Sequence, residues 1–155
     1  MRLASGIAPL RTWIDKGVKV GLGVDGSSSN DSGYLLNEAR QAMLLQRVNL
    51  GANKFSPREA LFTATRGGAE VLNRNDIGQI SVGKAADFAI YDLNKIAMSG
   101  AWSDPLAALV LCTPAETAYT ICNGEIISQN GHLNNFDLNL SLEKHKVASK
   151  RLLDL

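Results

Sequence analysis

Residues 18–25, VKVGLGVD, decide the fold, because a run of β-favouring residues ends there on a carboxylate. The run has the length of a buried parallel strand, and Gly21 and Gly23 indicate places where a side chain would be too large. A parallel strand needs neighbours at its edges and cover on both faces. One such strand cannot make a sheet by itself, so the sequence predicts a strand that belongs to a larger sheet.

Helical patterns lie on either side of this strand. Residues 7–16, IAPLRTWIDK, are predicted to form a short helix that Gly17 ends. Residues 34–50 repeat apolar side chains at three- and four-residue steps and are predicted to form a longer helix that ends before Gly51.

A third helix is predicted over residues 56–72, SPREALFTATRGGAEVL. Ser56 and Glu59 have the spacing of a capping box, with a proline between them at the first helical position. Gly67 and Gly68 weaken this helix, so close packing is the expected reason that they are tolerated. The expected buried face consists of Leu61, Ala64, Gly68, Val71 and Leu72.

The pattern changes after residue 75. Short β-favouring runs at 77–83, 86–93 and 117–133 are separated by glycine and asparagine, and Asn123–Gly124 indicates a hairpin turn. Asp104 is expected to cap a brief helix between these runs. The chain ends in a charged, loosely amphipathic helical pattern.

Composition and net charge indicate a globular domain and argue against nucleic-acid binding and a membrane span. The chain has 155 residues, of which 45% are hydrophobic and 20% charged, and this is typical of a globular domain. The formal charge of +1 is spread along the chain, so nucleic acid is not an expected partner, and no segment is apolar enough to span a membrane. Cys112 and Cys122 lack metal-site spacing and fit free thiols in the cytoplasm.

Several motifs together, in this order, resemble the C-terminal third of metal-dependent amidohydrolases. They are LASGIAP (3–9), VGLGVDGSSSND (20–31), EARQAMLLQR (38–47), SPREALFTATRGGAEVL (56–72) and DIGQISVGKAADFAIYDL (76–93). Within that superfamily, DPLAALVLC (104–112) is most similar to the branch of 8-oxoguanine deaminase and hydroxyatrazine aminohydrolase, which is cytosine deaminase-like. The resemblance covers nearly all of residues 2–135.

The resemblance implies an α/β fold that is the C-terminal part of a (β/α)8 TIM barrel plus part of a small β-sandwich. Residues 1–74 would supply the last barrel strand and helices, residues 75–135 the share of the sandwich, and residues 136–155 a C-terminal helix. A complete barrel takes about 250 residues, so the chain is expected to be incomplete on its own. A truncated frame, a fragment and one piece of a split protein all fit this expectation.

Two interpretations of Asp25 remain open from the residue pattern. A carboxylate at the C-terminal end of a barrel strand points into the active-site mouth, where it can bind a divalent metal and take a proton from water. An Asx turn, or an N-cap for the helix that begins near Ser32, would equally explain it. The resemblance implies the first role, catalytic and metal-binding, in the complete enzyme.

The loop that follows, with Ser27 and Asn30, offers hydroxyl and amide groups that could bind a heteroaromatic substrate. A solvated turn in which Asn30 or Asp31 caps the next helix is the alternative. The loop lacks the lysine and the glycine spacing of a phosphate-binding loop.

The resemblance implies zinc, or iron, in the complete enzyme. That metal site takes several histidines, whereas this chain has only His132 and His145, and neither matches a family ligand. Because Zn²⁺ prefers about four ligands, Asp25 alone is not expected to hold a metal.

The leading hypothesis is therefore a fragment of an amidohydrolase that deaminates a purine-like or triazine-like ring, inactive alone. The alternative is a non-catalytic structural half that complements a missing N-terminal segment or forms a homo-oligomer, since unpaired strand edges invite pairing with another chain. An independent small-ligand module would have only the serine-rich loop for support.

Overall fold

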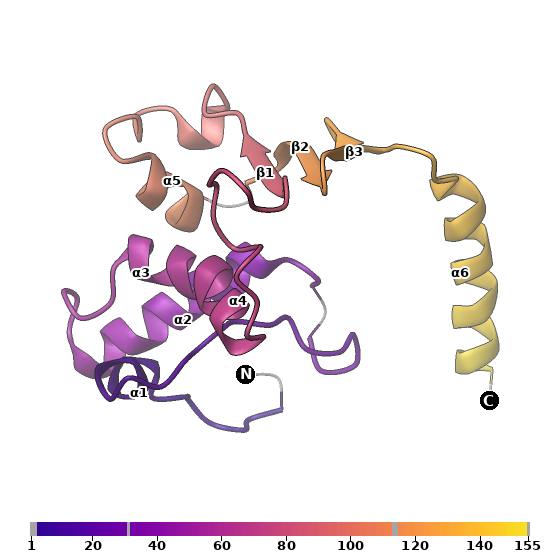
Figure 1. Ribbon diagram of the computed structural model, residues 1–155. Coiled ribbons are helices and arrows are strands. Elements are labelled where there is room, and N and C mark those ends of the chain that lie inside the picture. The colour runs from indigo at the N-terminus through magenta and orange to yellow at the C-terminus, as the bar shows by residue number, and fades with distance from the viewer. Residues whose placement is uncertain (1–2, 31, 113–114, 155) are drawn as a thin grey trace. The chain divides into compact units, whose positions relative to one another are not determined.

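The computed structural model describes residues 3–30, 32–112 and 115–154, and these form two compact units (Figure 1). The helical unit comprises Met1–Ala85 and Asp92–Ala115, and the sheet unit comprises Ala86–Tyr91 and Glu116–Leu155. The chain thus leaves the helical unit for one strand, returns to it, and then completes the sheet.

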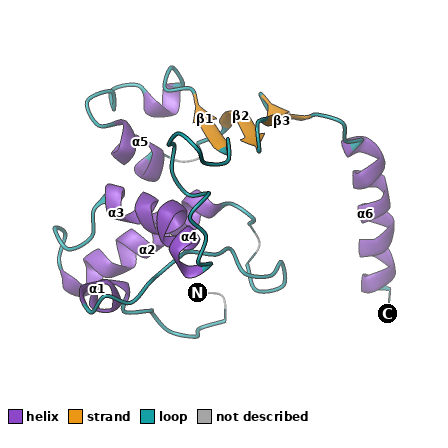
Figure 2. Cartoon of the chain, in the orientation of Figure 1, coloured by secondary structure: helices purple, strands orange, loops and turns teal. Residues whose placement is uncertain are grey.

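The helical unit contains short helices around one long helix (Figure 2). Its elements are α1 (Leu10–Asp15), α2 (Leu35–Leu50), α3 (Pro57–Phe62), the π-helical turn η1 (Thr63–Gly67), α4 (Gly68–Val71), the 3-10 turn η2 (Ile96–Met98) and α5 (Pro105–Leu111). Their apolar faces meet in a core of Leu10, Ala39, Met43, Phe55, Ala60 and Val110. Burial of these side chains is the main stabilising contribution in this unit.

The predicted caps are confirmed. The Ser56 hydroxyl accepts from the Glu59 backbone N–H, while the Glu59 carboxylate accepts from the Ser56 backbone N–H at 2.7 Å, which completes a capping box. Asp104 caps α5 by accepting from the Ala107 N–H at 3.0 Å. Gly51 follows α2 with a φ of 113°, a conformation that favours glycine.

Residues 18–24 do not form the predicted strand among the residues that the structure describes. Their backbone makes two hydrogen bonds, from Val18 N–H to Trp13 O and from Leu22 N–H to Thr63 O. A strand is defined by a ladder with a neighbour, and no described segment lies beside this one to provide it. The segment instead passes against the helical stretch that contains Gly67 and Gly68.

Close packing explains the glycines at this crossing. A Cβ on Gly67 would stand 2.3 Å from the Val20 carbonyl oxygen, and one on Gly21 would stand 2.8 Å from the Gly68 Cα. The prediction for Gly21 and Gly67 is confirmed. For Gly23 and Gly68 it is wrong, because a Cβ at either position would meet nothing within 4 Å.

The third predicted helix is real but interrupted. A π-helical turn at Thr63–Gly67 adds a residue to the turn and shifts the buried face, so Thr63, Gly67 and Ala69 are buried. Val71 and Leu72, expected in the core, are 52% and 66% exposed. Residues 77–83 form turns rather than a strand, again without a neighbouring strand.

The sheet unit contains four antiparallel strands in the order β1-β2-β3-β4. They are β1 (Phe88–Tyr91), β2 (Thr117–Cys122), β3 (Glu125–Gln129) and β4 (His132–Leu133). The predicted hairpin turn is confirmed between β2 and β3, where Asn123 and Gly124 have φ values of 49° and 83°. The unit ends in α6 (Leu138–Leu153), which Asp137 caps by accepting from the Leu140 N–H.

Within the described residues, no helix combines the length and the apolar character that crossing a membrane would require.

Candidate functional site

Asp25 ends the segment that packs on the π-helical turn. Its φ is 64°, in the left-handed region that Asp tolerates better than most residues, and its side chain is exposed. One carboxylate oxygen, Oδ1, accepts a hydrogen bond from the Gly26 backbone N–H at 2.7 Å. The other oxygen has no protein donor among the described residues and remains available to a ligand.

The loop after Asp25 is built from local hydrogen bonds. The Gly26 carbonyl accepts from the backbone N–H groups of Ser29 and Asn30, both at 2.9 Å, and this closes a tight turn. Ser27 lies in that turn with its side chain exposed to solvent. The turn therefore presents Asp25 and Ser27 together on one short, solvent-facing loop.

Asn30 is held at both ends of its side chain. Its Nδ2 donates to Glu38 Oε1 at 2.6 Å, and its Oδ1 accepts from the Ser32 N–H at 3.2 Å. The expectation that Asn30 caps the next helix is wrong, since the N-cap of α2 is Tyr34. The alternative cap, Asp31, lies outside the described residues.

Tyr34 joins the end of this loop to the segment after α5. Its hydroxyl donates to the Ala115 carbonyl at 2.5 Å and accepts from the Ala115 N–H at 3.0 Å. Six residues further along α2, Arg40 donates to the Leu111 carbonyl at 2.5 Å, where α5 ends. Two side chains of this stretch thus fix it to residues more than 70 positions away in sequence.

A cavity of about 330 Å³ lies beside this loop in the helical unit. Residues of four stretches line it: Gly6, Ile7 and Ala8 before α1, Leu10 and Trp13 on α1, Val20 to Gly23, and Glu38, Gln41, Ala42, Leu45 and Gln46 on α2. Polar and apolar atoms contribute to its walls in similar measure, and Glu38 is the acidic group. Such a lining suits a flat ring or an apolar side chain better than an anion.

Gln46 is a structural residue that the sequence prediction missed. Its side chain is 2% exposed, donates from Nε2 to the Ala8 carbonyl at 2.9 Å and accepts at Oε1 from the Arg11 N–H at 3.2 Å. Because both backbone groups lie at the start of α1, Gln46 fixes the residue 6–8 segment against α2. Its spacing from Met43 on a buried face was the available signal, but a glutamine is usually placed on the surface.

An ion-pair network links α1 to α3. The Arg11 guanidinium contacts Asp15 at 2.6 Å and Glu59 at 2.5 Å. Partial burial on its own would raise the pKa of Glu59, but hydrogen bonds from Ser56 and Arg11 outweigh it and hold that pKa below its usual value. The hydrogen bond to Asp15 raises the pKa of Arg11, so the pair stays charged.

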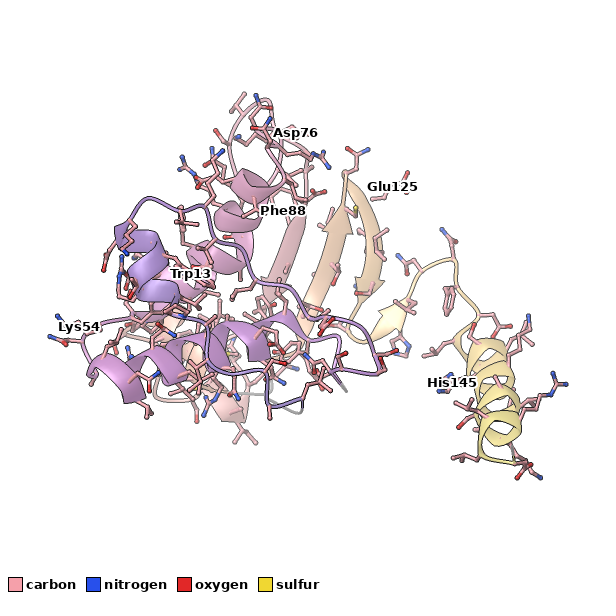
Figure 3. The ribbon with its side chains drawn as sticks, turned by 90° about the horizontal axis from the view of Figure 1, so that it is seen from below. Trp13, Lys54, Asp76, Phe88, Glu125 and His145 are labelled. Atoms are coloured by element: carbon pink, nitrogen blue, oxygen red, sulfur yellow. The ribbon has the colours of Figure 1, made fainter. Side chains whose placement is uncertain are left out.

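Within the described residues, no three side chains of His, Cys, Asp or Glu gather closely enough to hold a metal ion. The two histidines both belong to the sheet unit, His132 on β4 and His145 on α6, and both are exposed; Figure 3 shows His145 on its helix. Asp25 therefore stays a predicted metal ligand that the described residues do not complete to a site of three.

Comparisons with known proteins identify the family. The sequence profile of the amidohydrolase family matches residues 1–127. The chain is 42% identical to an 8-oxoguanine deaminase of Pseudomonas aeruginosa over 99% of its length and 34% of that enzyme's. It is 40% identical to a hydroxydechloroatrazine ethylaminohydrolase of Pseudomonas sp. strain ADP over 78% of its length and 26% of that enzyme's.

The fold has a close counterpart among solved structures. An adenosine deaminase from Xanthomonas campestris, solved with bound zinc, superposes with a TM-score of 0.90 and 26% identity over 99% of this chain and 35% of that one. The α/β class and the correspondence to part of an amidohydrolase barrel with a small antiparallel sheet are thereby confirmed. The chain spans about a third of the length of the relatives that it matches, and it belongs to the amidohydrolase family.

Proposed function

We propose that this chain supplies the C-terminal part of a metal-dependent amidohydrolase that hydrolytically deaminates a purine-like or triazine-like ring. The observation that carries the proposal is the exposed Asp25 carboxylate, with one free oxygen, two residues after Gly23, which lines a ring-sized cavity of mixed polar and apolar character. Similarity to deaminases of 8-oxoguanine and to an enzyme of triazine breakdown supports the choice of rings. Cys112 and Cys122 are free thiols, as is usual for proteins of a reducing compartment, and this supports action in the cytoplasm.

In the proposed reaction, water adds to the ring carbon that bears the exocyclic amino group. The oxygen of water forms a bond to that carbon, the carbon–nitrogen bond breaks, and ammonia leaves. The Asp25 carboxylate takes a proton from the attacking water and returns it to the departing nitrogen, so the carboxylate is regenerated. Asp25 is thus the proposed catalytic residue, as a general base and then a general acid.

Asp25 is also the proposed ligand for zinc, or iron, in the complete enzyme. An exposed carboxylate with a free oxygen fits one position of such a site, but the described residues contain no group of three or more His, Cys, Asp or Glu side chains that could hold a metal. A metal site that includes Asp25 therefore needs ligands from outside these residues. When bound, the metal would lower the pKa of the attacking water.

Ser27 and Asn30 are the proposed substrate-binding residues. The Ser27 hydroxyl is exposed on the same turn as Asp25, and the Asn30 amide keeps one N–H and one lone pair beyond its present bonds. Both groups could bind the polar edge of a ring while its faces lie against the apolar part of the cavity walls. The heterocycle is the proposed small-molecule partner.

Deaminase assays of residues 1–155, with and without a reconstituted N-terminal segment from the 8-oxoguanine deaminase relative, test this proposal. Guanine derivatives and isocytosine are suitable substrates, with release of ammonia as the readout. We expect activity only in the reconstituted protein, and its loss on Asp25→Asn. Undiminished activity of the Asp25→Asn protein would refute the assignment.

A second candidate function is that of a structural half that pairs with another chain or with itself. Residues 18–24 leave most of their backbone groups without partners among the described residues, and Ile7, Trp13 and Val18 expose 46%, 40% and 51% of their surface beside them. An unpaired segment next to exposed apolar groups favours association. Size-exclusion chromatography at several concentrations distinguishes a monomer from a self-associated form. A compact monomer at every concentration would exclude self-association.

A further inference from the structure

Glu38 stands apart from the other acidic residues near the site because it reaches back to the loop that carries Asp25. It lies in the first turn of α2, is partly buried, lines the cavity, and accepts from Asn30 Nδ2 at 2.6 Å. A hydrogen bond to an ionised acceptor is about twice as strong as one between neutral groups. This bond therefore ties Asn30, at the end of the loop, directly to α2.

We propose that Glu38 is a positioning residue. By accepting the hydrogen bond from Asn30 Nδ2, it fixes the position of the Asp25–Asn30 loop and the orientation of the Asn30 amide. The inference rests on the proposed function, because it assigns Glu38 a role in the reaction that Asp25 would perform. Glu38 acts through Asn30 and not through the reacting atoms.

Beyond the loop Tyr34 is anchored through its hydroxyl to Ala115, whereas the other bonds that the structure describes in the loop are short-range. The Gly26 carbonyl accepts from Ser29 and Asn30, Asn30 accepts from Ser32, and the Ser32 hydroxyl accepts from Tyr34. Each of these short-range bonds links residues at most four apart, so they fix the shape of the turn, while its place on the unit depends on the Glu38 bond to Asn30 and on Tyr34 beyond it. Loops with only local bonds open readily.

Glu38 is suited to this role because α2 is a firm support. Its neighbour Ala39 and the next core residue, Met43, are fully buried, and Arg40 ties the same turn to the end of α5. A negative side chain in the first turn also interacts favourably with the helix dipole. The Glu38 carboxylate is therefore held by a well-packed helix within hydrogen-bond distance of Asn30.

Holding Asn30 also determines what its amide can offer. With one N–H bound to Glu38 and one lone pair bound to the Ser32 N–H, the amide cannot rotate without breaking both bonds. Its remaining N–H and lone pair then have fixed directions. A ring bound at the loop would meet an oriented donor and acceptor, which is what preorganisation requires.

The test compares three variants of residues 1–155. Glu38→Gln keeps an acceptor at the same reach, Glu38→Asp keeps the charge but shortens the side chain, and Glu38→Ala removes the acceptor. Glu143→Ala, on α6 and outside the site, is the matched control. Amide hydrogen exchange of Ser29 and Asn30 reports the order of the loop, and exchange at Met43 reports whether the unit stays folded.

We expect Glu38→Ala and Glu38→Asp to speed exchange at Ser29 and Asn30 by about tenfold, the usual effect of losing one such bond, with Met43 unchanged. Glu38→Gln should retain most of the protection, and Asn30→Ala combined with Glu38→Ala should add little to either alone. Unchanged loop exchange in Glu38→Ala, or equal acceleration in Glu38→Gln, would overturn the inference.

Kinetics of the reconstituted protein separate this inference from the proposed function. Glu38→Ala should lower kcat by at least about tenfold with a smaller change in KM, because a misplaced Asp25 weakens the chemical step more than binding. Absence of deaminase activity in the unmodified reconstituted protein would refute the proposed function and with it the catalytic part, while the exchange result would still decide whether Glu38 orders the loop. Normal kcat in Glu38→Ala would overturn the catalytic part alone.

Discussion

The Val20 carbonyl oxygen lies only 2.3 Å from the position that a Cβ on Gly67 would take. The segment that leads to Asp25 can therefore approach the π-helical turn only if residue 67 lacks a side chain. Its neighbour Gly68 has no such constraint, since a Cβ there would meet nothing within 4 Å. Two adjacent glycines in one helical stretch thus have different roles.

Gly67→Ala should lower the free energy of unfolding by about 1–3 kcal/mol, because the obstructing atom is backbone and cannot rotate away. Gly68→Ala is the matched variant and should raise it by about 0.5–1 kcal/mol, the usual gain of alanine over glycine inside a helix. Urea unfolding followed by circular dichroism measures both. Equal effects of the two substitutions would contradict the close approach of Val20.

Gln46→Ala should also destabilise the helical unit, by about 2–4 kcal/mol. It leaves the Ala8 carbonyl and the partly buried Arg11 N–H without partners and opens a cavity beside Met43. Gln79→Ala, at an exposed position, is the control and should be within about 0.5 kcal/mol of the unchanged protein. Denaturant midpoints compare the two, and a neutral Gln46→Ala would show that the two hydrogen bonds contribute nothing net.

Features that depend on neighbours in sequence could be predicted. The capping box of Ser56 and Glu59 and the turn of Asn123 and Gly124 need only residues a few positions apart, so their residue types determine them. The strand at 18–24 could not be settled in the same way, because a strand also requires a partner. The described residues contain none for it.

The π-helical turn and the Glu38–Asn30 bond show a second limit. The turn moves the buried face from Val71 and Leu72 to Thr63, Gly67 and Ala69, and the sequence pattern assumed a continuous α-helix. Asn30 and Glu38 are eight residues apart across a loop and a helix start, a spacing with no regular geometry. The sequence therefore pointed to the loop of Asp25 but not to the side chain that holds it.

Glu59 should make stability depend on pH in the acid range. Its pKa in the folded chain lies below the ordinary value of 4.5, so its contribution is fully present above about 4.5 and is lost as pH falls through the lower folded value. Glu59→Gln should be less stable than the unchanged protein at pH 7, and the difference should shrink on acidification. Urea midpoints between pH 7 and pH 3 measure this, with Glu143→Gln as a control.

A constant difference across that range would show that Arg11 and Ser56 do not favour the ionised form of Glu59. Asp76 contributes in the same direction, because its hydrogen bond from Arg74 also lowers its pKa. The Glu59→Gln protein should therefore retain a weaker pH dependence of stability. The double variant Glu59→Gln with Asp76→Asn should be the flattest.

Two substitutions of Asp25 can distinguish an effect on catalysis from an effect on the free energy of unfolding. Asp25→Asn should leave the free energy of unfolding of residues 1–155 within about 0.5 kcal/mol, because the side chain is exposed and asparagine also tolerates a positive φ. Asp25→Ala should lower it by about 1–2 kcal/mol, since alanine is strained at a φ of 64°. In the reconstituted protein both substitutions should abolish ammonia release, because neither side chain can take a proton from water. Activity that followed stability, with Asp25→Asn active and Asp25→Ala inactive, would instead assign Asp25 to the turn alone.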